Sequence, residues 1–190
     1  MEKIILASAS PRRKEILEKY NIEFDTIVSD VEENFSQDCT KEQIPMMLAL
    51  RKALNVETKC TNGIIIAADT IVYKNEVLGK PTDRENAFNM LRKLSDGRHE
   101  VITGVAIIRV GTYDKVVFYD TTQVFFKSLS DKDIHTYIDT DEIWDKAGAY
   151  AIQGKGVELI EKIDGDYYNV MGLPIHKVKL VLDQYFTIND

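Results

Sequence analysis

The segment 8–15, SASPRRKE, gathers polar and basic side chains where a helix is expected to begin. Ser8 and Ser10 stand in the preceding loop, and Arg12 and Arg13 fall in the first turn. The free N–H groups and the dipole of a helix N-terminus favour an anion, and arginine offers a planar fork that matches phosphate oxygens. Cations at this end are locally unfavourable, and a bound phosphate would offset that. The segment indicates either a phosphate site or a solvated helix start with incidental charge.

Asp69 is the second candidate, because it interrupts the apolar run 63–73, GIIIAADTIVY. A carboxylate is costly to bury without a partner, so we expect Asp69 to emerge at a strand end near a cleft. There it would hold a metal ion or activate water. The alternative is a buried aspartate that pairs with a lysine or caps a turn. The pattern alone leaves both interpretations open.

Other charged side chains would complete such a site. Glu32 and Glu33 follow an expected strand, and alternation sends one of them toward the cleft. With Asp69 it would form a two-carboxylate site for a hard cation such as Mg²⁺. Lys52, within an expected helix, and Lys80, just before another, can each meet phosphate oxygens as a point charge. Acidic pairs and single lysines are more often solvated, so these four residues need further support.

Two loop segments in the C-terminal third have compositions typical of ligand-binding loops. The segment 147–156, AGAYAIQGKG, contains glycines that permit close approach of the backbone to a ligand, and Gln153 can present its amide to the edge of a base. The segment lacks the spacing of a P-loop. The segment 164–174, DGDYYNVMGLP, is rich in turn-forming and aromatic residues, and Asp166 and Asn169 are consistent with simple turns.

Several other kinds of chemistry are disfavoured by spacing. None of the three histidines lies within four residues of another, so no helical zinc pair exists. The serines of the first loop have no evident histidine partner and no GxSxG elbow, which weighs against a serine hydrolase. Cys39 and Cys60 are too few for a disulfide scaffold and lack metal-finger spacing, so we expect reduced thiols.

Composition limits the partners of the chain. A length of 190 residues suits one domain over 1–190. The formal charge is −7, from 24 basic and 31 acidic residues, which weighs against binding of a nucleic acid polymer. No apolar run approaches the roughly 20 residues that span a membrane. These features predict a cytoplasmic protein with a small-molecule ligand.

Strand-like and helix-like patterns alternate along the chain, which predicts an α/β domain that positions these groups. Strands are expected at 4–8, 23–31, 63–73, 100–110, 115–129 and 157–163. Helices are expected after Ser10 and Pro11, over 40–56 from a Thr40–Gln43 capping box, after a Thr82–Glu85 capping box, over 130–139, and from Pro174 with Ile175, Val178, Leu182 and Tyr185 on one face.

Six strings that span nearly the whole chain carry a resemblance to a known family. They are ILASASPRRKEIL at the start, VEE at 31–33, AADTIV at 67–72, LGKP at 78–81, DKAGAYAIQGKG at 145–156 and DGDYYNVMGLPI at 164–175. Together they resemble the Maf proteins, of the Maf/Ham1-like nucleotide pyrophosphatases. The resemblance implies an α/β fold with an extended, twisted mixed sheet flanked by helices, and two lobes around a central cleft. It also implies a homodimer.

The activity that the resemblance implies is hydrolysis of a nucleoside triphosphate to the monophosphate and pyrophosphate. A divalent cation, Mg²⁺, Mn²⁺ or Co²⁺, would be the cofactor, and removal of unwanted nucleotides with a link to septum formation would be the role. The family roles carried onto this chain make Asp69 the catalytic base and a metal ligand, and Glu32 a metal ligand. The phosphate-binding residues would be Ser8, Arg13, Lys52 and Lys80.

Three positions distinguish subtypes in this family. The chain has Arg12, Thr70 and Gln153 there, which resembles the subtype that acts on dTTP and UTP, with CTP and modified uridine triphosphates as further candidates. Two alternatives stay open. One is a nucleotide-sensing regulator of division without turnover, and the other is an enzyme for purine substrates such as 7-methyl-GTP or inosine-like triphosphates.

Overall fold

The computed structural model describes residues 2–36 and 38–186. Its contacts divide the chain into two compact units. Unit 1 comprises Met1–Asp69, Thr103–Asp120 and Met171–Asp190, and unit 2 comprises Thr70–Ile102 and Thr121–Val170.

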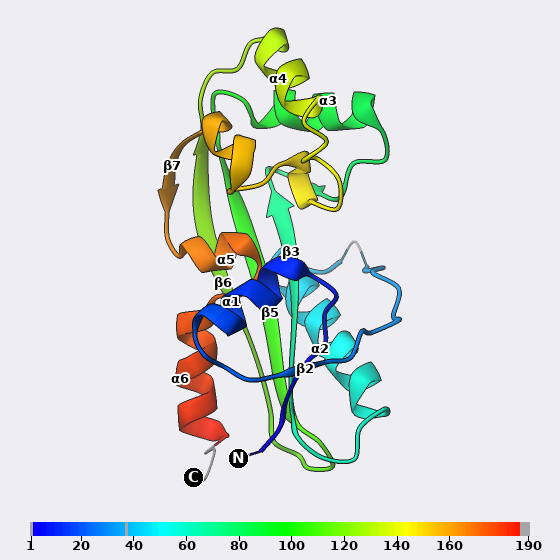
Figure 1. The fold of residues 1–190 in the computed structure, drawn as a ribbon. Helices are drawn as coiled ribbons and strands as arrows, with labels where there is room; N and C mark the ends of the chain where they lie inside the picture. The colour runs from blue at the N-terminus through cyan, green and yellow to red at the C-terminus, as the bar shows by residue number, and fades with distance from the viewer. Residues whose placement is uncertain (1, 37, 187–190) are drawn as a thin grey trace. The chain divides into compact units, whose positions relative to one another are not determined.

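Seven strands within the described residues form one mixed sheet, in the order β2-β1-β3-β5-β6-β7 with β4 paired to β3 (Figure 1). The strands are β1 (Ile4–Leu6), β2 (Asp25–Thr26), β3 (Ile64–Tyr73), β4 (Val77–Leu78), β5 (Arg98–Arg109), β6 (Lys115–Phe126) and β7 (Ile160–Asp164). β1 runs parallel to both β2 and β3, whereas β4 and β7 are antiparallel to their partners. The predicted α/β fold with a mixed sheet is confirmed.

Helices flank this sheet. They are α1 (Pro11–Lys19), α2 (Gln43–Glu57), α3 (Arg84–Leu94), α4 (Asp131–Ile138), α5 (Tyr167–Met171) and α6 (Ile175–Tyr185), with the 3₁₀ helices η1 (Ala147–Ala149) and η2 (Gly154–Leu159). No helix in the described part of the chain is long and apolar enough to cross a membrane. Cys39 and Cys60 are free thiols, as predicted.

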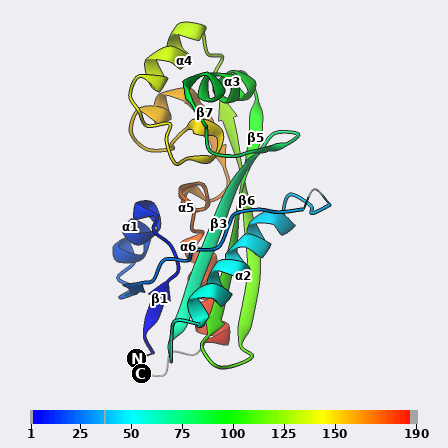
Figure 2. The same ribbon diagram turned by 90° about the vertical axis from the view of Figure 1, so that its right-hand side faces the viewer.

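In unit 1, α2 packs on one face of the sheet, and α1 and α6 lie on the other (Figure 2). Small residues of α2, Ala49 and Ala53, meet Ile65 and Ala67 of β3 in a fully buried cluster. β5 approaches the first turn of α2 so closely that a Cβ on Gly104 would lie 2.2 Å from the carbonyl carbon of Pro45. A side chain there would push the helix away, so the glycine permits this close packing.

In unit 2, α3 lies beside both α4 and η1. The helix predicted over 130–139 is present as α4, and it begins with a capping box in which the side chains of Ser130 and Asp133 each accept from the other's backbone N–H group. The predicted box at the start of α3 was one residue early. Asp83 is the N-cap, and its side chain accepts from the backbone N–H of Asn86, whose own side chain reaches back to Thr82.

Several boundaries differ from the sequence prediction. The strand predicted over 23–31 is only the two residues of β2, because its neighbour β1 is just three residues long and offers no more partners. The strand predicted from 157 begins at Ile160, because η2 occupies the residues before it. Tyr185 was expected on the buried face of α6 but is 54% exposed.

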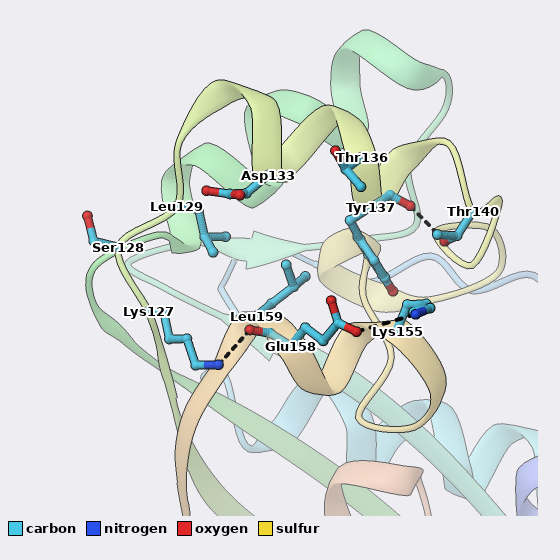
Figure 3. A pocket seen from close by; sticks show the side chains of 10 residues that line it. All are labelled: Lys127, Ser128, Leu129, Asp133, Thr136, Tyr137, Thr140, Lys155, Glu158 and Leu159. Atoms are coloured by element: carbon cyan, nitrogen blue, oxygen red, sulfur yellow. Dashed lines mark hydrogen bonds and ion pairs between the residues drawn. The ribbon is translucent and has the colours of Figure 1, made fainter.

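A pocket with a volume of about 340 Å³ opens in unit 2 between α4 and η2 (Figure 3). Its polar groups are largely engaged with one another. Lys127 Nζ donates to the carbonyl of Glu158 at 2.8 Å, Lys155 pairs with the Glu158 carboxylate, and Asp133 serves the α4 cap. None of the residues predicted to bind or react with a ligand lines this pocket.

His99 of β5 is an ionisable group buried in unit 2, with 3% of its surface exposed. Its Nε2 lies 2.7 Å from the hydroxyl of Tyr150, and the rings of Phe126 and Tyr150 meet it edge to face. Burial, with a smaller contribution from the charge of Lys74, lowers the pKa of His99 from 6.5 to about 3. Burial also raises the pKa of Tyr150. The imidazole is therefore neutral in the folded protein.

This pKa predicts a pH-dependent stability. The unfolded chain binds a proton at His99 below pH 6.5, whereas the folded chain does so only near pH 3. The free energy of unfolding is therefore highest above pH 6.5. It decreases as the pH falls below 6.5, by up to about 1.4 kcal/mol per pH unit. We expect the free energy of unfolding, measured by urea denaturation between pH 4.5 and 7.5, to have a shallower slope against pH in His99→Met than in the wild type. His135→Gln, an exposed histidine, is the control and should keep the wild-type slope.

Candidate active site

The N-terminus of α1 is organised around the hydroxyl of Ser8. Ser10 is the N-cap of α1 but its side chain makes no capping bond, and Pro11 occupies the first helical position. Ser8 Oγ instead accepts from the backbone N–H of Ser10 at 3.2 Å and from Arg13 Nη1 at 3.0 Å. Arg13 Nε donates to the carbonyl of Gly172 at 2.8 Å. These bonds hold the Arg13 guanidinium against the loop that precedes α1.

The Arg13 guanidinium lies in a field of both signs. Burial lowers the pKa of Arg13, and the neighbouring charge of Arg12 lowers it further, whereas Asp69 and Glu33 oppose this. Arginine keeps its charge in proteins even so. The region therefore brings two guanidinium groups near two carboxylates.

Lys52 joins these carboxylates. Its Nζ donates to Asp69 Oδ1 and to Glu33 Oε1, each at 2.6 Å. The side chains of Lys52 and Asp69 are only 12% and 10% exposed. Asp69 was expected at a strand end, but β3 continues to Tyr73, so the carboxylate is buried within the strand and requires a partner. In the structure, Asp69 therefore has the contact that the sequence analysis named as an alternative, a buried aspartate paired with a lysine.

The acidic pair after β2 is divided between two positions. Both glutamates are exposed, but Glu33 contacts Lys52, whereas Glu32 accepts from Asn34 Nδ2 at 3.2 Å. Asn34 is held in turn by Arg51 of α2, whose guanidinium donates to its carbonyl at 2.7 Å and to its Oδ1 at 3.1 Å. The sequence prediction left open which glutamate turns inward, and the assignment of Glu32 as a metal ligand stays a prediction. Arg51 and Asn34 were missed, because nothing in their spacing reveals a contact across 17 residues.

The other predicted site residues belong to unit 2. Thr70 is half-buried in β3, next in the chain to Asp69. Lys80 is exposed just after β4, and Gln153 is the half-buried N-cap of η2. In unit 1, the structure therefore brings together Ser8, Arg12, Arg13, Lys52 and Asp69. The other three predicted residues, Thr70, Lys80 and Gln153, are placed within unit 2.

The two carboxylates that contact Lys52, those of Glu33 and Asp69, are also ligands of the kind that a metal site uses. Across residues 2–36 and 38–186, no three His, Cys, Asp or Glu side chains converge on a common point. Glu33 and Asp69 nevertheless direct hard oxygen donors at one cation, the Lys52 ammonium. Mg²⁺ is commonly held by one or two carboxylates together with water and substrate phosphates, rather than by a cage of protein ligands. Two carboxylates therefore fit such an ion.

The fold and this cluster define an α/β protein with a candidate anion site at a helix N-terminus, beside paired carboxylates. The family model described as "Maf-like protein" matches residues 3–185, which run through both units. The chain belongs to the Maf family. That one domain spans 1–190 stays a prediction.

Curated relatives agree with this membership over their full length. A protein of Alkaliphilus oremlandii named "dTTP/UTP pyrophosphatase" is 47% identical over 190 residues, which cover 100% of this chain and 99% of the relative. A protein of Clostridioides difficile with the same name is 46% identical over 187 residues, covering 98% and 96%. The solved "structure of the Staphylococcus aureus Ham1 protein" is 19% identical, with a TM-score of 0.44 over 66% of this chain and 72% of that one.

The buried position of the Lys52–Asp69 pair predicts how Lys52→Met affects stability. Removal of the ammonium leaves the Asp69 carboxylate buried without its partner, which should lower the free energy of unfolding by about 3 kcal/mol. The double variant Lys52→Met, Asp69→Asn should recover most of this loss, because no lone charge remains. Urea denaturation at neutral pH measures both.

Lys115→Met is a suitable control. Lys115 of β6 pairs with Glu57 of α2, the helix that also carries Lys52, but at a more exposed position. It should cost less than about 1 kcal/mol. Equal losses in Lys52→Met and Lys115→Met would show that the Lys52 pair has no special role in the folded state.

Proposed function

We propose that this protein is a nucleoside triphosphate pyrophosphatase that hydrolyses dTTP and UTP to the monophosphate and pyrophosphate. The observation that carries the proposal is the contact of the Lys52 ammonium with Asp69 and Glu33, beside the half-buried Arg13. It combines cations for phosphates with a carboxylate for water. The names of the relatives support the same activity and the same bases.

In the proposed mechanism, the phosphates bind at the N-terminus of α1. The Ser8 hydroxyl donates a hydrogen bond to them, and Arg13, Lys52 and Lys80 neutralise and orient them. Asp69 accepts a proton from a water molecule, whose oxygen forms a bond to the α-phosphorus. The bond from the α-phosphorus to the bridging oxygen breaks, and pyrophosphate leaves with its electron pair.

A divalent cation such as Mg²⁺, Mn²⁺ or Co²⁺ fits this proposal as cofactor. Asp69 and one glutamate of the pair Glu32 and Glu33 would hold it. When bound, it would neutralise charge that develops on the phosphates. Before substrate binds, Lys52 offsets part of the charge of Glu33 and Asp69, and it would remain beside the phosphates as a point charge.

Arg12, Thr70 and Gln153 are proposed to select the base. The neutral amide of Gln153 can pair with the donor–acceptor edge of uracil or thymine, whereas a glutamate would suit a cationic methylated guanine better. CTP and modified uridine triphosphates are further candidates. We also propose a role in clearing unwanted nucleotides in the cytoplasm, a link to septum formation and a homodimer.

The proposal predicts that Asp69→Asn nearly abolishes turnover. Loss of the base should lower kcat for UTP by about 10²- to 10⁴-fold. The measurement is pyrophosphate release from dTTP and UTP with Mg²⁺ or Mn²⁺. Asp114→Asn, an exposed carboxylate of the β5–β6 turn, is the matched control and should be fully active.

The same assay separates the enzyme from a nucleotide-sensing protein. A pure binder would bind UTP without release of pyrophosphate, and Asp69→Asn would then bind at least as tightly, because one negative charge near the phosphates is gone. Turnover by Asp69→Asn at the wild-type rate would show that Asp69 is not the base.

A pair of variants decides which glutamate serves the metal. Glu33 lies at Lys52 and Glu32 at Asn34, so the geometry favours a larger effect from Glu33→Gln. We expect Glu33→Gln to raise the Mn²⁺ concentration for half-maximal activity by about tenfold or more. Calorimetric titration of Mn²⁺ in the presence of product provides an independent readout. A larger effect from Glu32→Gln would instead support the original assignment of Glu32.

A further inference from the structure

The turn after Gln153 encloses a carboxylate of the protein itself. Glu142 accepts hydrogen bonds from the backbone N–H of Lys155, at 3.2 Å to Oε1 and 3.0 Å to Oε2. Its Oε2 also accepts from the backbone N–H of Gly156 at 3.3 Å. Hydrogen bonds to an ionised acceptor are about twice as strong as neutral ones. A single half-buried side chain thus binds the backbone that begins η2.

The glycines of this turn make room for that carboxylate. Gly154 has φ +62°, and a Cβ on it would lie 2.6 Å from Glu142 Oε1. A Cβ on Gly156 would lie 2.0 Å from the carbonyl oxygen of Ala151. The sequence suggested that these glycines allow a ligand to approach the backbone. In the structure, Glu142 and Ala151 occupy that space.

Gln153 lies directly beside this turn. It is the N-cap of η2 with an extended backbone, φ −119° and ψ 169°, and it follows the buried Ile152. The Glu142 bonds to residues 155 and 156 fix the chain on its C-terminal side, and the contact of Gly156 with Ala151 closes the turn. Glu142 therefore helps to fix the backbone from which the Gln153 side chain leaves.

We propose that Glu142 is a positioning residue that sets base selectivity by fixing Gln153. This inference rests on the proposed function, in which Gln153 reads the base. Loss of Glu142 frees two backbone N–H groups and lets the turn at Gly154 relax. The amide of Gln153 then loses its fixed direction, while the phosphate-binding residues of unit 1 are unchanged.

The experiment compares kcat/KM for UTP and for GTP in the wild type, Glu142→Ala, Glu142→Gln and Gln153→Ala. Glu142→Ala should lower kcat/KM for UTP by between about tenfold and a hundredfold, mainly through KM, and leave that for GTP unchanged. Glu142→Gln keeps one acceptor oxygen and should recover part of the loss. The double variant Glu142→Ala, Gln153→Ala should be no worse than Gln153→Ala, because both act on the same contact.

Glu158→Gln is the matched control. Glu158 belongs to η2, but its side chain is 73% exposed and contacts the Lys155 side chain at 3.4 Å. It should behave as the wild type with both nucleotides. Gly154→Ala, whose Cβ would displace the Glu142 carboxylate, should reproduce the loss of selectivity of Glu142→Ala.

The outcomes separate this inference from the proposed function. Suppose that the wild type is active on UTP and that Glu142→Ala lowers kcat/KM by the same factor for UTP and GTP. That result would overturn the positioning role and leave only a structural one. Multiplicative losses in the double variant would also overturn it. If the wild type releases no pyrophosphate from UTP or dTTP, the proposed function fails. Hydrogen exchange then tests the contact alone, and protection of the amides of Lys155 and Gly156 that is unchanged in Glu142→Ala would refute it.

Discussion

The ammonium of Lys52, held between Asp69 and Glu33, is the interaction on which the site depends. Ionised groups are costly to bury, and the cost is offset only when partners lie at hydrogen-bond distance. Lys52 can reach Asp69 only if α2 packs tightly on β3. The small residues Ala49 and Ala53, and the absence of a side chain at Gly104, permit that packing. The polar cluster of unit 1 therefore depends on the close packing of its apolar core.

This contact reconciles two interpretations of Asp69 that the sequence left as alternatives. A paired structural aspartate and a reactive one are usually contrasted, yet the contact with the Lys52 ammonium offsets the cost of burying the Asp69 carboxylate in a strand. A substrate that brings phosphates and a cation would supply new partners for the same groups. Under the proposed function, the residues that offset one another's charge before binding are the same ones that would act on the substrate.

The sequence predicted the α/β class, the long strands and a helix that begins at Pro11, because period and capping patterns are local properties. It predicted β2 as too long, since the length of an edge strand depends on its partner β1. Strand alternation left open whether Glu32 or Glu33 turns inward, and the contacts that separate them, of Glu33 with Lys52 and of Glu32 with Asn34, are not encoded in a local pattern. Contacts between residues far apart in the chain leave no periodic trace.

The turn at Gly154 shows the same limit most clearly. Glycine reports that something approaches the backbone closely, but not what approaches it. A ligand and a side chain of the same protein make the same demand for space and for N–H donors. In this chain the Glu142 carboxylate meets both demands at residues 154–156, so the glycines there support a rigid turn. Under the proposed function, selection of the base falls to Gln153 on that turn, and its precision would depend on how firmly the turn is held.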